Sequence, residues 1–370
     1  MEALEIRNVI EQNKNSTYSE TNGDSKIETH NEEFMSNVED EEVAIYFDTD
    51  LLLDHGIAQE DVKELKRAGL NTIKGILMCT KKKLVNLRGL NEEKVNKIRK
   101  ISSKITMLND TNCFMTALEL SDQRKQVFTL TTGSDNLDNI LGGGVESMSI
   151  TEVFGESRTG KTQLSHTLCV TAQIPGKDGY EGGKVVFIDT EHTFRPERIR
   201  PIAERFQLEY SAVLENILYA RAYNSEHQYD LFYSVVQKFH EEPGTFKLLI
   251  VDSVMALFRV DYTSGEIPER QSKLGLMLSR LQKISEEYNV AVFLTNQITS
   301  DLNHSLINDV DVKPVGGNIL AHSTTTRIAL KKEKGNVRIA RVYDSPNLEE
   351  KETEFIITGG GIANPKNFDD

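Results

Sequence analysis

The chain has 370 residues, a length that favours one sizeable domain with a smaller one beside it. With 38% hydrophobic and 27% charged residues, its composition excludes disorder over the whole length and collagen-like or disulfide-rich scaffolds. No stretch approaches the roughly 18 uncharged apolar residues of a membrane span, so no membrane partner is expected, and no secretory signal is visible. The cysteines lack CxxC spacing, which predicts unpaired thiols in a reducing compartment: Cys79, Cys113 and Cys169.

Charge is distributed unevenly along the chain. The formal net charge is −14, but residues 1–50 contain 14 acidic and 3 basic side chains, whereas residues 61–105 contain 13 basic and 4 acidic ones. Electrostatic fields decay over roughly 10 Å at moderate salt, so binding depends on the local patch. The acidic total therefore does not exclude a nucleic-acid partner.

The first hundred residues divide into a tail and a helical segment. Residues 1–45 are acidic and poor in large apolar side chains, which predicts a disordered tail. Residues 46–106 carry apolar residues at spacings of three and four, with Gly69 and Gly89 at tight turns. This pattern resembles the helix-hairpin-helix module, an all-α DNA-binding domain whose turn amides meet a phosphate. The cations available for DNA are Lys81, Lys82, Lys83, Arg88, Lys94, Lys97, Arg99 and Lys100. A helical bundle with a solvated basic face is the alternative.

The rest of the chain predicts a linker, 107–127, and an α/β core, 128–370. We expect strands at 147–154, 184–189, 217–221, 247–252 and 290–295, and helices at 161–173, 196–206, 225–240 and 270–288. Several strands are continuous apolar runs, as in parallel sheets covered on both faces. Segments 325–332 and 337–343 predict an antiparallel C-terminal hairpin after the doubly wound, mainly parallel sheet.

One motif in the core carries phosphate chemistry. The run GESRTGKT follows a predicted strand, opens a predicted helix and fits GxxxxGK[ST] (Walker A). In this motif backbone N–H groups surround the phosphates, Lys161 neutralises phosphate oxygens, and Thr162 offers a hydroxyl to Mg²⁺. The predicted ATP-binding residues are Gly155, Glu156, Ser157, Arg158, Thr159, Gly160, Lys161 and Thr162.

Three more strands end in polar residues. Asp252 is the predicted Mg²⁺ partner, and Glu191 is the predicted base that orients water; a solvated carboxylate is the alternative for Glu191. Gln297 offers a neutral amide that can sense the γ-phosphate. These strand ends meet at one edge of a parallel sheet beside the phosphate loop.

With these motifs the chain resembles the RecA-like strand-exchange recombinases, most of all their meiosis-specific eukaryotic branch. The resemblance covers about residues 45–365 and is carried by the runs LGGGVESMSITEVFGESRTGKTQLSHTLCVTAQ, VVFIDTEHTFRPERIR, FRVDYTSGEIPERQSKL and LQKISEEYNVAVFLTNQ. It implies a RecA-like P-loop ATPase core whose protomers assemble into a ring or a helical filament. On single-stranded DNA the filament exchanges strands with homologous double-stranded DNA.

The resemblance also implies roles at the filament interface. Phe114 and Ala117 match a polymerisation motif that inserts into the next protomer. Arg198 matches a residue that stacks on adenine, His322 one that senses the neighbour's nucleotide, and Asp311 with Pro314 a cap over ATP.

Two loops match the DNA-contacting loops of the family, at 259–270 and 299–313. The DNA-binding residues implied are Arg259, Tyr262, Arg270 and, on the C-terminal hairpin, Arg338. An aromatic ring beside arginines suits single strands, because stacking tolerates any base. A surface salt-bridge role is the alternative for each cation.

Three departures from the family pattern bear on these roles. The first loop is one residue shorter and lacks the arginine usually found between two glycines. The second is also shorter and has a single lysine, Lys313, where two are usual. His192 stands where Gly or Asn is common.

The sequence thus predicts a DNA-dependent ATPase that uses ATP and Mg²⁺ for strand exchange, works with recombination mediator proteins and resides in the nucleus. The alternative is an ATP-binding mediator without strand exchange of its own. A ring helicase is disfavoured, because the basic helical segment and the Phe114 linker have no evident place in one.

Overall fold

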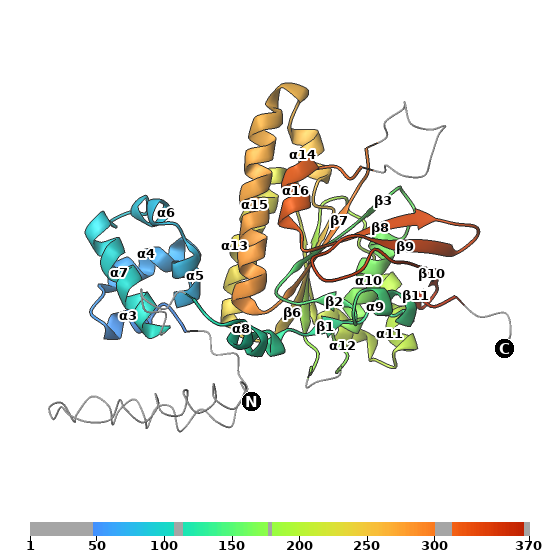
Figure 1. Cartoon of the computed structure of the whole chain (residues 1–370), viewed down its shortest axis with the longest axis horizontal. Helices are drawn as coiled ribbons and strands as arrows, with labels where there is room; N and C mark the ends of the chain where they lie inside the picture. The colour runs from blue at the N-terminus through green and yellow to red at the C-terminus, as the bar shows by residue number, and fades with distance from the viewer. Residues whose placement is uncertain (1–46, 107–113, 177–179, 300–312, 366–370) are drawn as a thin grey trace, which may run out of the picture. The chain divides into compact units, whose positions relative to one another are not determined.

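The computed structural model describes residues 47–106, 114–176, 180–299 and 313–365 (Figure 1). The described residues all belong to one compact unit, and the predicted tail, 1–45, lies outside the described residues. No helix in the described ranges is long and apolar enough to cross a bilayer.

Five short helices begin the described chain. They are α3 (Leu51–Asp54), α4 (Gln59–Arg67), α5 (Ile73–Met78), α6 (Lys81–Val85) and α7 (Glu92–Ile105). Thr72, Thr80 and Asn91 each accept a hydrogen bond from the third backbone N–H of the helix that follows, which fixes where α5, α6 and α7 begin. The helices bury one apolar cluster of their own, including Leu52, Leu65, Ile73, Ile76, Leu84, Val95 and Ile98.

The core is a single twisted sheet. Within the described ranges its nine strands run in the order β11-β10-β9-β8-β3-β7-β6-β4-β5. The parallel part comprises β3 (Ile150–Gly155), β4 (Lys184–Asp189), β5 (Ile217–Arg221), β6 (Phe246–Asp252), β7 (Ala291–Asn296) and β8 (Thr326–Lys332). The strands β9 (Val337–Asp344), β10 (Glu352–Thr358) and β11 (Gly361–Ala363) extend it antiparallel. The predicted mainly parallel sheet with an antiparallel hairpin is confirmed.

Helices cover both faces of this sheet (Figure 1). One face packs on α10 (Lys161–Thr171), α11 (Pro196–Arg205) and α12 (Tyr210–Glu215), the other on α13 (Ser225–Glu241) and α15 (Ile267–Tyr288). Successive residues of β4 serve opposite faces: Val185 and Phe187 join the first core, Val186 and Ile188 the second. This alternation explains the continuous apolar run in the sequence.

Smaller elements complete the chain. They are α8 (Ala117–Gln123), η1 (Arg124–Gln126), β1 (Thr129–Leu130), α9 (Asp135–Ile140), β2 (Val145–Glu146), α14 (Ala256–Asp261), η2 (Ser264–Glu266) and α16 (Gly317–Ser323). The β1–β2 pair forms a separate two-stranded sheet. The sequence analysis missed these short elements together with β10 and β11.

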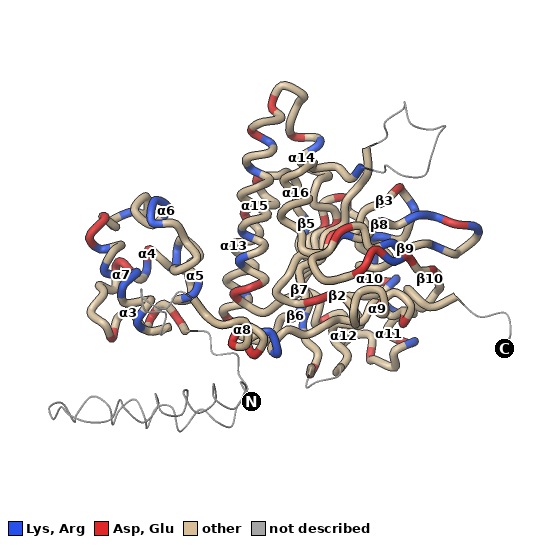
Figure 2. The backbone as a smooth tube through the Cα atoms, viewed as in Figure 1, with Lys and Arg blue, Asp and Glu red and all other residues tan. Residues whose placement is uncertain are grey.

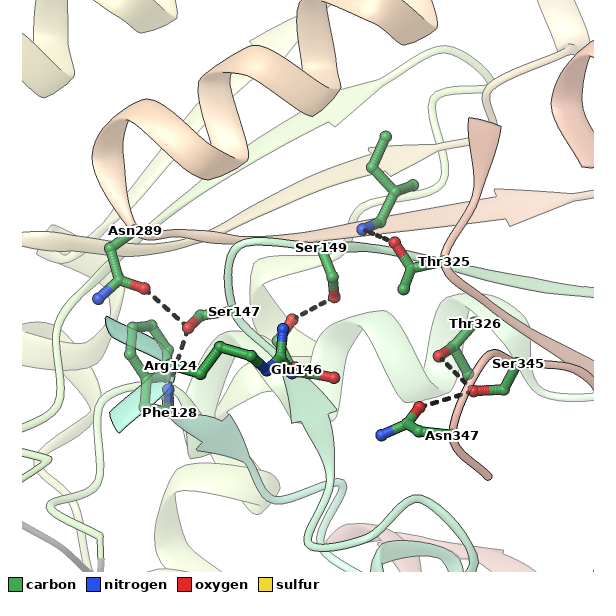
Figure 3. A network of polar contacts seen from close by, with 11 residues as sticks. Arg124, Phe128, Glu146, Ser147, Ser149, Asn289, Thr325, Thr326, Ser345 and Asn347 are labelled. Carbon is green, nitrogen blue, oxygen red and sulfur yellow. Dashed lines mark hydrogen bonds and ion pairs between the residues drawn. The ribbon is translucent and has the colours of Figure 1, made fainter. Parts of the chain in front are cut away.

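A polar network holds the end of the sheet where β3 begins (Figure 3). The Phe128 N–H donates to Ser147 Oγ at 3.0 Å, and Ser147 Oγ donates to Asn289 Oδ1 at 2.8 Å. The Ile150 N–H donates to Thr325 Oγ1 at 3.4 Å. These bonds join β1, β3, the end of α15 and the start of β8. They fix the first end of β3, and the phosphate loop follows its other end.

Candidate nucleotide and DNA site

The phosphate loop runs from the end of β3 to the start of α10. Its glycines are sterically required. A Cβ on Gly155 would lie 2.3 Å from the Leu330 carbonyl oxygen, and one on Gly160 would lie 2.8 Å from Ile357 Cδ1. Gly160 also has φ +107°, a left-handed conformation that favours glycine. The predicted strand–loop–helix context of the motif is present.

Lys161 lies at the first position of α10, folded over the loop. Its Nζ donates to the carbonyl oxygens of Gly155 at 2.9 Å and Glu156 at 2.8 Å. Burial lowers the pKa of this ammonium, and the charges of Asp252 and Glu191 partly oppose that effect. Two of the three ammonium donors are engaged by carbonyls of the loop, so an anion bound there would take the third or displace these contacts.

Asp252 ends β6 and is almost fully buried. Burial raises the pKa of its carboxyl to about 6, although the neighbouring Thr295 and Thr162 hydroxyls oppose the rise. Thr295 Oγ1 donates to Asp252 Oδ1, whereas Oδ2 is buried without a close hydrogen-bond partner. An unpartnered carboxylate oxygen beside a threonine hydroxyl is a donor set that suits Mg²⁺. The described residues hold no cluster of three or more acidic, His or Cys ligands.

Glu191, Gln297 and Arg259 form a chain of side-chain hydrogen bonds. Gln297 Nε2 donates to Glu191 Oε1 at 3.0 Å, and Arg259 Nη1 donates to Gln297 Oε1 at 2.6 Å. Ser253 Oγ donates to the same Glu191 oxygen at 2.8 Å. The strand ends of β4 and β7 therefore meet as predicted, and the Gln297 amide links a candidate catalytic carboxylate to a candidate DNA-binding arginine.

Asp189 is a residue of this edge that the sequence analysis did not assign a role. It is fully buried at the end of β4 and accepts hydrogen bonds from three backbone N–H groups, those of Glu191, Thr193 and Phe194, at 3.0 to 3.2 Å. The loop that carries Glu191, including the left-handed His192, is thereby fixed. An Asp that ends an apolar strand and precedes a loop is the available sequence signal, because such side chains bond the amides that follow.

Arg198 lies on α11 with the edges of its guanidinium engaged. Nε donates to Gln163 Oε1 at 2.6 Å, and the two terminal nitrogens donate to the carbonyls of Thr358 and Gly359. Hydrogen bonds lie in the guanidinium plane and leave its faces for stacking. This geometry is compatible with the predicted adenine contact.

The first candidate DNA loop, residues 259–270, is organised around Tyr262. Its ring stacks on Phe258 with centroids 6.0 Å apart, and Lys273 Nζ lies 5.4 Å from the ring centre. Thr263 and Glu266 form a capping box in the turn that follows. Tyr262 thus packs on the core, and its base-stacking role stays a prediction.

The loop's other side chains differ in exposure. Val260 is 82% exposed and Ile267 is 44% exposed. Arg259 is exposed, whereas Arg270 Nε is buried without a hydrogen-bond partner. Most of the second loop, residues 300–312, lies outside the described ranges.

Arg338 is placed differently from an exposed DNA contact. Its residue is 8% exposed, and its guanidinium donates to the carbonyls of Arg158, Gly335 and Val337. A DNA contact requires an accessible cation, but the Arg338 guanidinium is buried and hydrogen-bonded to carbonyls near the phosphate loop. The predicted DNA role of Arg338 therefore does not fit its position.

The residues expected at a filament interface are exposed or not described. Phe114 is 94% exposed, and Ala117 is the exposed first residue of α8, which a Thr116–Glu119 capping box begins. His322 is exposed on α16, and Pro314 forms a bridge with Ile298. Asp311 and Cys113 lie outside the described residues, while Cys79 and Cys169 are buried and unpaired.

The two glycine turns of the helical segment are unequal. A Cβ on Gly69 would lie 3.1 Å from both Arg280 and Tyr233, whereas one on Gly89 would meet nothing within 4 Å. Figure 2 shows Lys and Arg gathered on α6. Lys81 pairs with Glu92 and Lys94 with Asp61, but no partner within the described ranges holds Lys82, Lys83, Arg88 or Lys100. The open turn and the unpaired cations are the better candidates for a DNA phosphate.

Comparison with known proteins adds to this geometry. The sequence model of the Rad51 family matches residues 123–365. The human meiotic recombination protein DMC1/LIM15 homolog is 59% identical over 330 residues, covering 89% of this chain and 96% of that protein. The mouse DMC1/LIM15 homolog is 58% identical over 333 residues, 90% of this chain and 97% of its own. The Arabidopsis thaliana DMC1 homolog is 51% identical over 328 residues, 88% and 94% of the two chains. With the family model spanning most of the chain and such relatives spanning nearly all of it, the chain belongs to the Rad51 family.

Proposed function

We propose that this chain is a meiotic strand-exchange recombinase, an ATPase that forms filaments on single-stranded DNA during homologous recombination. The observation that carries the coupling is the hydrogen-bonded chain Glu191–Gln297–Arg259, which joins the nucleotide edge of the sheet to the first DNA loop. The family membership and the meiotic recombination proteins among its relatives support the reaction.

Nucleotide binding follows from the phosphate loop. Backbone N–H groups of residues 155–162 and the Lys161 ammonium hold the phosphates, and Arg198 offers a guanidinium face to adenine. Thr162 and the unpartnered Oδ2 of Asp252 would hold Mg²⁺, which neutralises phosphate charge when bound. Glu191, kept in place by Ser253, orients the attacking water and accepts its proton.

Gln297 couples this site to DNA. Its amide donates to Glu191 and accepts from Arg259, so a rotation of the amide that follows the γ-phosphate changes the position of Arg259. Arg259 then contacts a DNA phosphate in a way that depends on which nucleotide is bound. DNA affinity thereby becomes a function of the nucleotide state.

The remaining surfaces serve assembly and duplex capture. Phe114, with almost no contact within its own chain, anchors in the next protomer of the filament. The open Gly89 turn with Lys82, Lys83 and Arg88 contacts DNA phosphates. Chromosomal DNA as substrate implies residence in the nucleus, and mediator proteins load the filament.

Joint-molecule formation tests this function. Purified protein, single-stranded DNA and homologous duplex are combined with ATP and Mg²⁺, with ADP, or without nucleotide. We expect joint molecules only with ATP. Binding of ATP and DNA without joint molecules would indicate a mediator and contradict the proposal.

Gln297→Ala tests the coupling separately. We expect it to bind ATP within about twofold of wild type, because it keeps the phosphate loop, but to lose most of the ATP-dependent gain in single-strand affinity. The matched control is Gln237→Ala, an exposed glutamine that bonds Glu241 on α13. A full nucleotide response in Gln297→Ala would show that coupling runs elsewhere.

A further inference from the structure

The C-terminal strands β8 and β10 form a floor beneath the phosphate loop. Gly155 approaches the Leu330 carbonyl of β8 so closely that a Cβ would collide with it. Gly160 lies over Ile357 of β10, where a Cβ would be 2.8 Å from Cδ1, the end of the isoleucine side chain. The loop therefore rests on backbone and side chains from β8 and β10, and its shape depends on strands outside the motif.

Arg338, on β9 between those two strands, supplies the polar part of this floor. Its Nε donates to the Arg158 carbonyl at 3.2 Å, and Nη1 donates to the carbonyls of Gly335 at 3.1 Å and Val337 at 2.8 Å. The residue is 8% exposed. One guanidinium thus ties the phosphate loop to the β8–β9 turn.

The hydrogen bond to the Arg158 carbonyl fixes the orientation of a peptide in the middle of the phosphate loop. Arg158 has φ +67°, a left-handed conformation that costs a non-glycine residue about 1 kcal/mol or more. The donor from Arg338 holds the peptide after Arg158 in one orientation. In a planar trans peptide the C=O and the next N–H point in opposite directions. Anchoring the Arg158 oxygen on the floor side therefore directs the Thr159 N–H to the opposite side of the loop.

The backbone N–H of Thr159 is a hydrogen-bond donor that a bound phosphate could satisfy. Thr159 is 1% exposed, and no hydrogen bond from its backbone N–H exists within the described part of the chain. Backbone donors that converge in a left-handed turn form anion-binding nests. Arg338 also has no carboxylate partner among the described residues, so its positive charge adds to the field at this loop.

We propose that Arg338 is a positioning residue of the nucleotide site, which holds the Arg158 peptide so that the Thr159 N–H faces a phosphate, and not a DNA contact. This inference rests on the proposed nucleotide binding. It extends the site from the phosphate-loop motif to a residue about 180 positions further along the chain, which the motif itself gives no reason to include.

Equilibrium binding of a fluorescent ATP analogue, measured without DNA, tests the proposal on the full-length chain. We expect Arg338→Gln to weaken nucleotide binding about tenfold, as loss of one charge-assisted hydrogen bond does. Arg338→Lys keeps the charge and one donor and should recover part of that loss. The control is Arg341→Gln on the same strand, whose exposed guanidinium pairs with Glu350 and should leave nucleotide affinity unchanged.

Single-strand affinity at saturating nucleotide distinguishes the two roles. A positioning residue predicts near wild-type DNA affinity once nucleotide is saturating. Unchanged nucleotide affinity in Arg338→Gln with weakened DNA binding overturns the proposal in favour of a DNA contact. If Arg338→Gln does not fold, as far-ultraviolet circular dichroism would show, Arg338→Lys decides in the same two assays. A wild-type chain that bound no nucleotide would instead refute the proposed function.

Discussion

The edge of the sheet where the strands end differs from the surfaces proposed to bind DNA or a second protomer. Side chains at the edge are hydrogen-bonded within the chain, whereas side chains on those surfaces are exposed. At the edge, backbone N–H groups hold Asp189, a hydroxyl holds Asp252, and a carboxylate and a guanidinium hold the Gln297 amide, all within the same chain. By contrast, Phe114 and Val260 are more than four-fifths exposed. Where all partners of a side chain belong to the same chain, the chain alone fixes its position. Where the partner is DNA or a second protomer, the side chain stays exposed until that partner binds.

Removing Lys161 is the most severe way to break the self-contained edge. Lys161→Ala deletes the ammonium that lies over the loop. Loss of the charge-assisted hydrogen bonds that this ammonium would make to phosphate oxygens predicts at least about 100-fold weaker nucleotide binding. Fluorescent nucleotide titration measures the loss. Lys351→Ala, which removes an exposed lysine paired with Glu349, is the matched control. Wild-type ATP affinity in Lys161→Ala would remove the phosphate-loop assignment.

Charging Phe114 breaks the other side of the comparison. Phe114→Glu replaces an exposed anchor by a carboxylate, and loss of an aromatic anchor commonly costs about 2 kcal/mol or more at each interface. Because a filament repeats the interface, we expect short oligomers in light scattering and electron microscopy, with monomer nucleotide affinity retained. Leu276→Glu, at another exposed apolar residue on α15, is the control. Long filaments of Phe114→Glu would contradict the anchor role.

The sequence predicted where the strands end, but it did not predict which loop groups contact the residues at those ends. The strand ends were predictable, because apolar runs covered on both faces must be central strands whose carboxyl ends share one edge. The bounds of β4 agree with the prediction to the residue. The role of Ser253 was not predictable, because its hydroxyl meets Glu191 only after two neighbouring strands are packed together. Asp189 offered only a general signal, an Asp between an apolar strand and a loop, whose side chain bonds the amides that follow.

Arg338 shows a second limit. A basic residue on a terminal hairpin suggests a surface contact, and only the packing of β9 against the phosphate loop turns its guanidinium inward. Tyr262 is a similar case, since its ring packs with Phe258 and Lys273. Sequence spacing places residues on an element, but it does not decide which neighbours fill the space around them.

The buried carboxyl of Asp252 gives the subtlest test, a pH dependence that sharpens the account of the edge. Its pKa is raised to about 6 in the folded chain, against about 3.9 when unfolded. Between these values the native state binds a proton that the unfolded state lacks, so this group destabilises the fold fully above about pH 6 and not below about pH 4. We therefore expect wild type without nucleotide to gain stability relative to Asp252→Asn as pH falls from 7 to 5. Urea denaturation at several pH values measures the difference, and a constant gap would contradict the shift. The same protonation removes the anionic ligand offered to Mg²⁺, so Mg²⁺-dependent nucleotide affinity should weaken severalfold over that range, opposite in sign to the gain in stability.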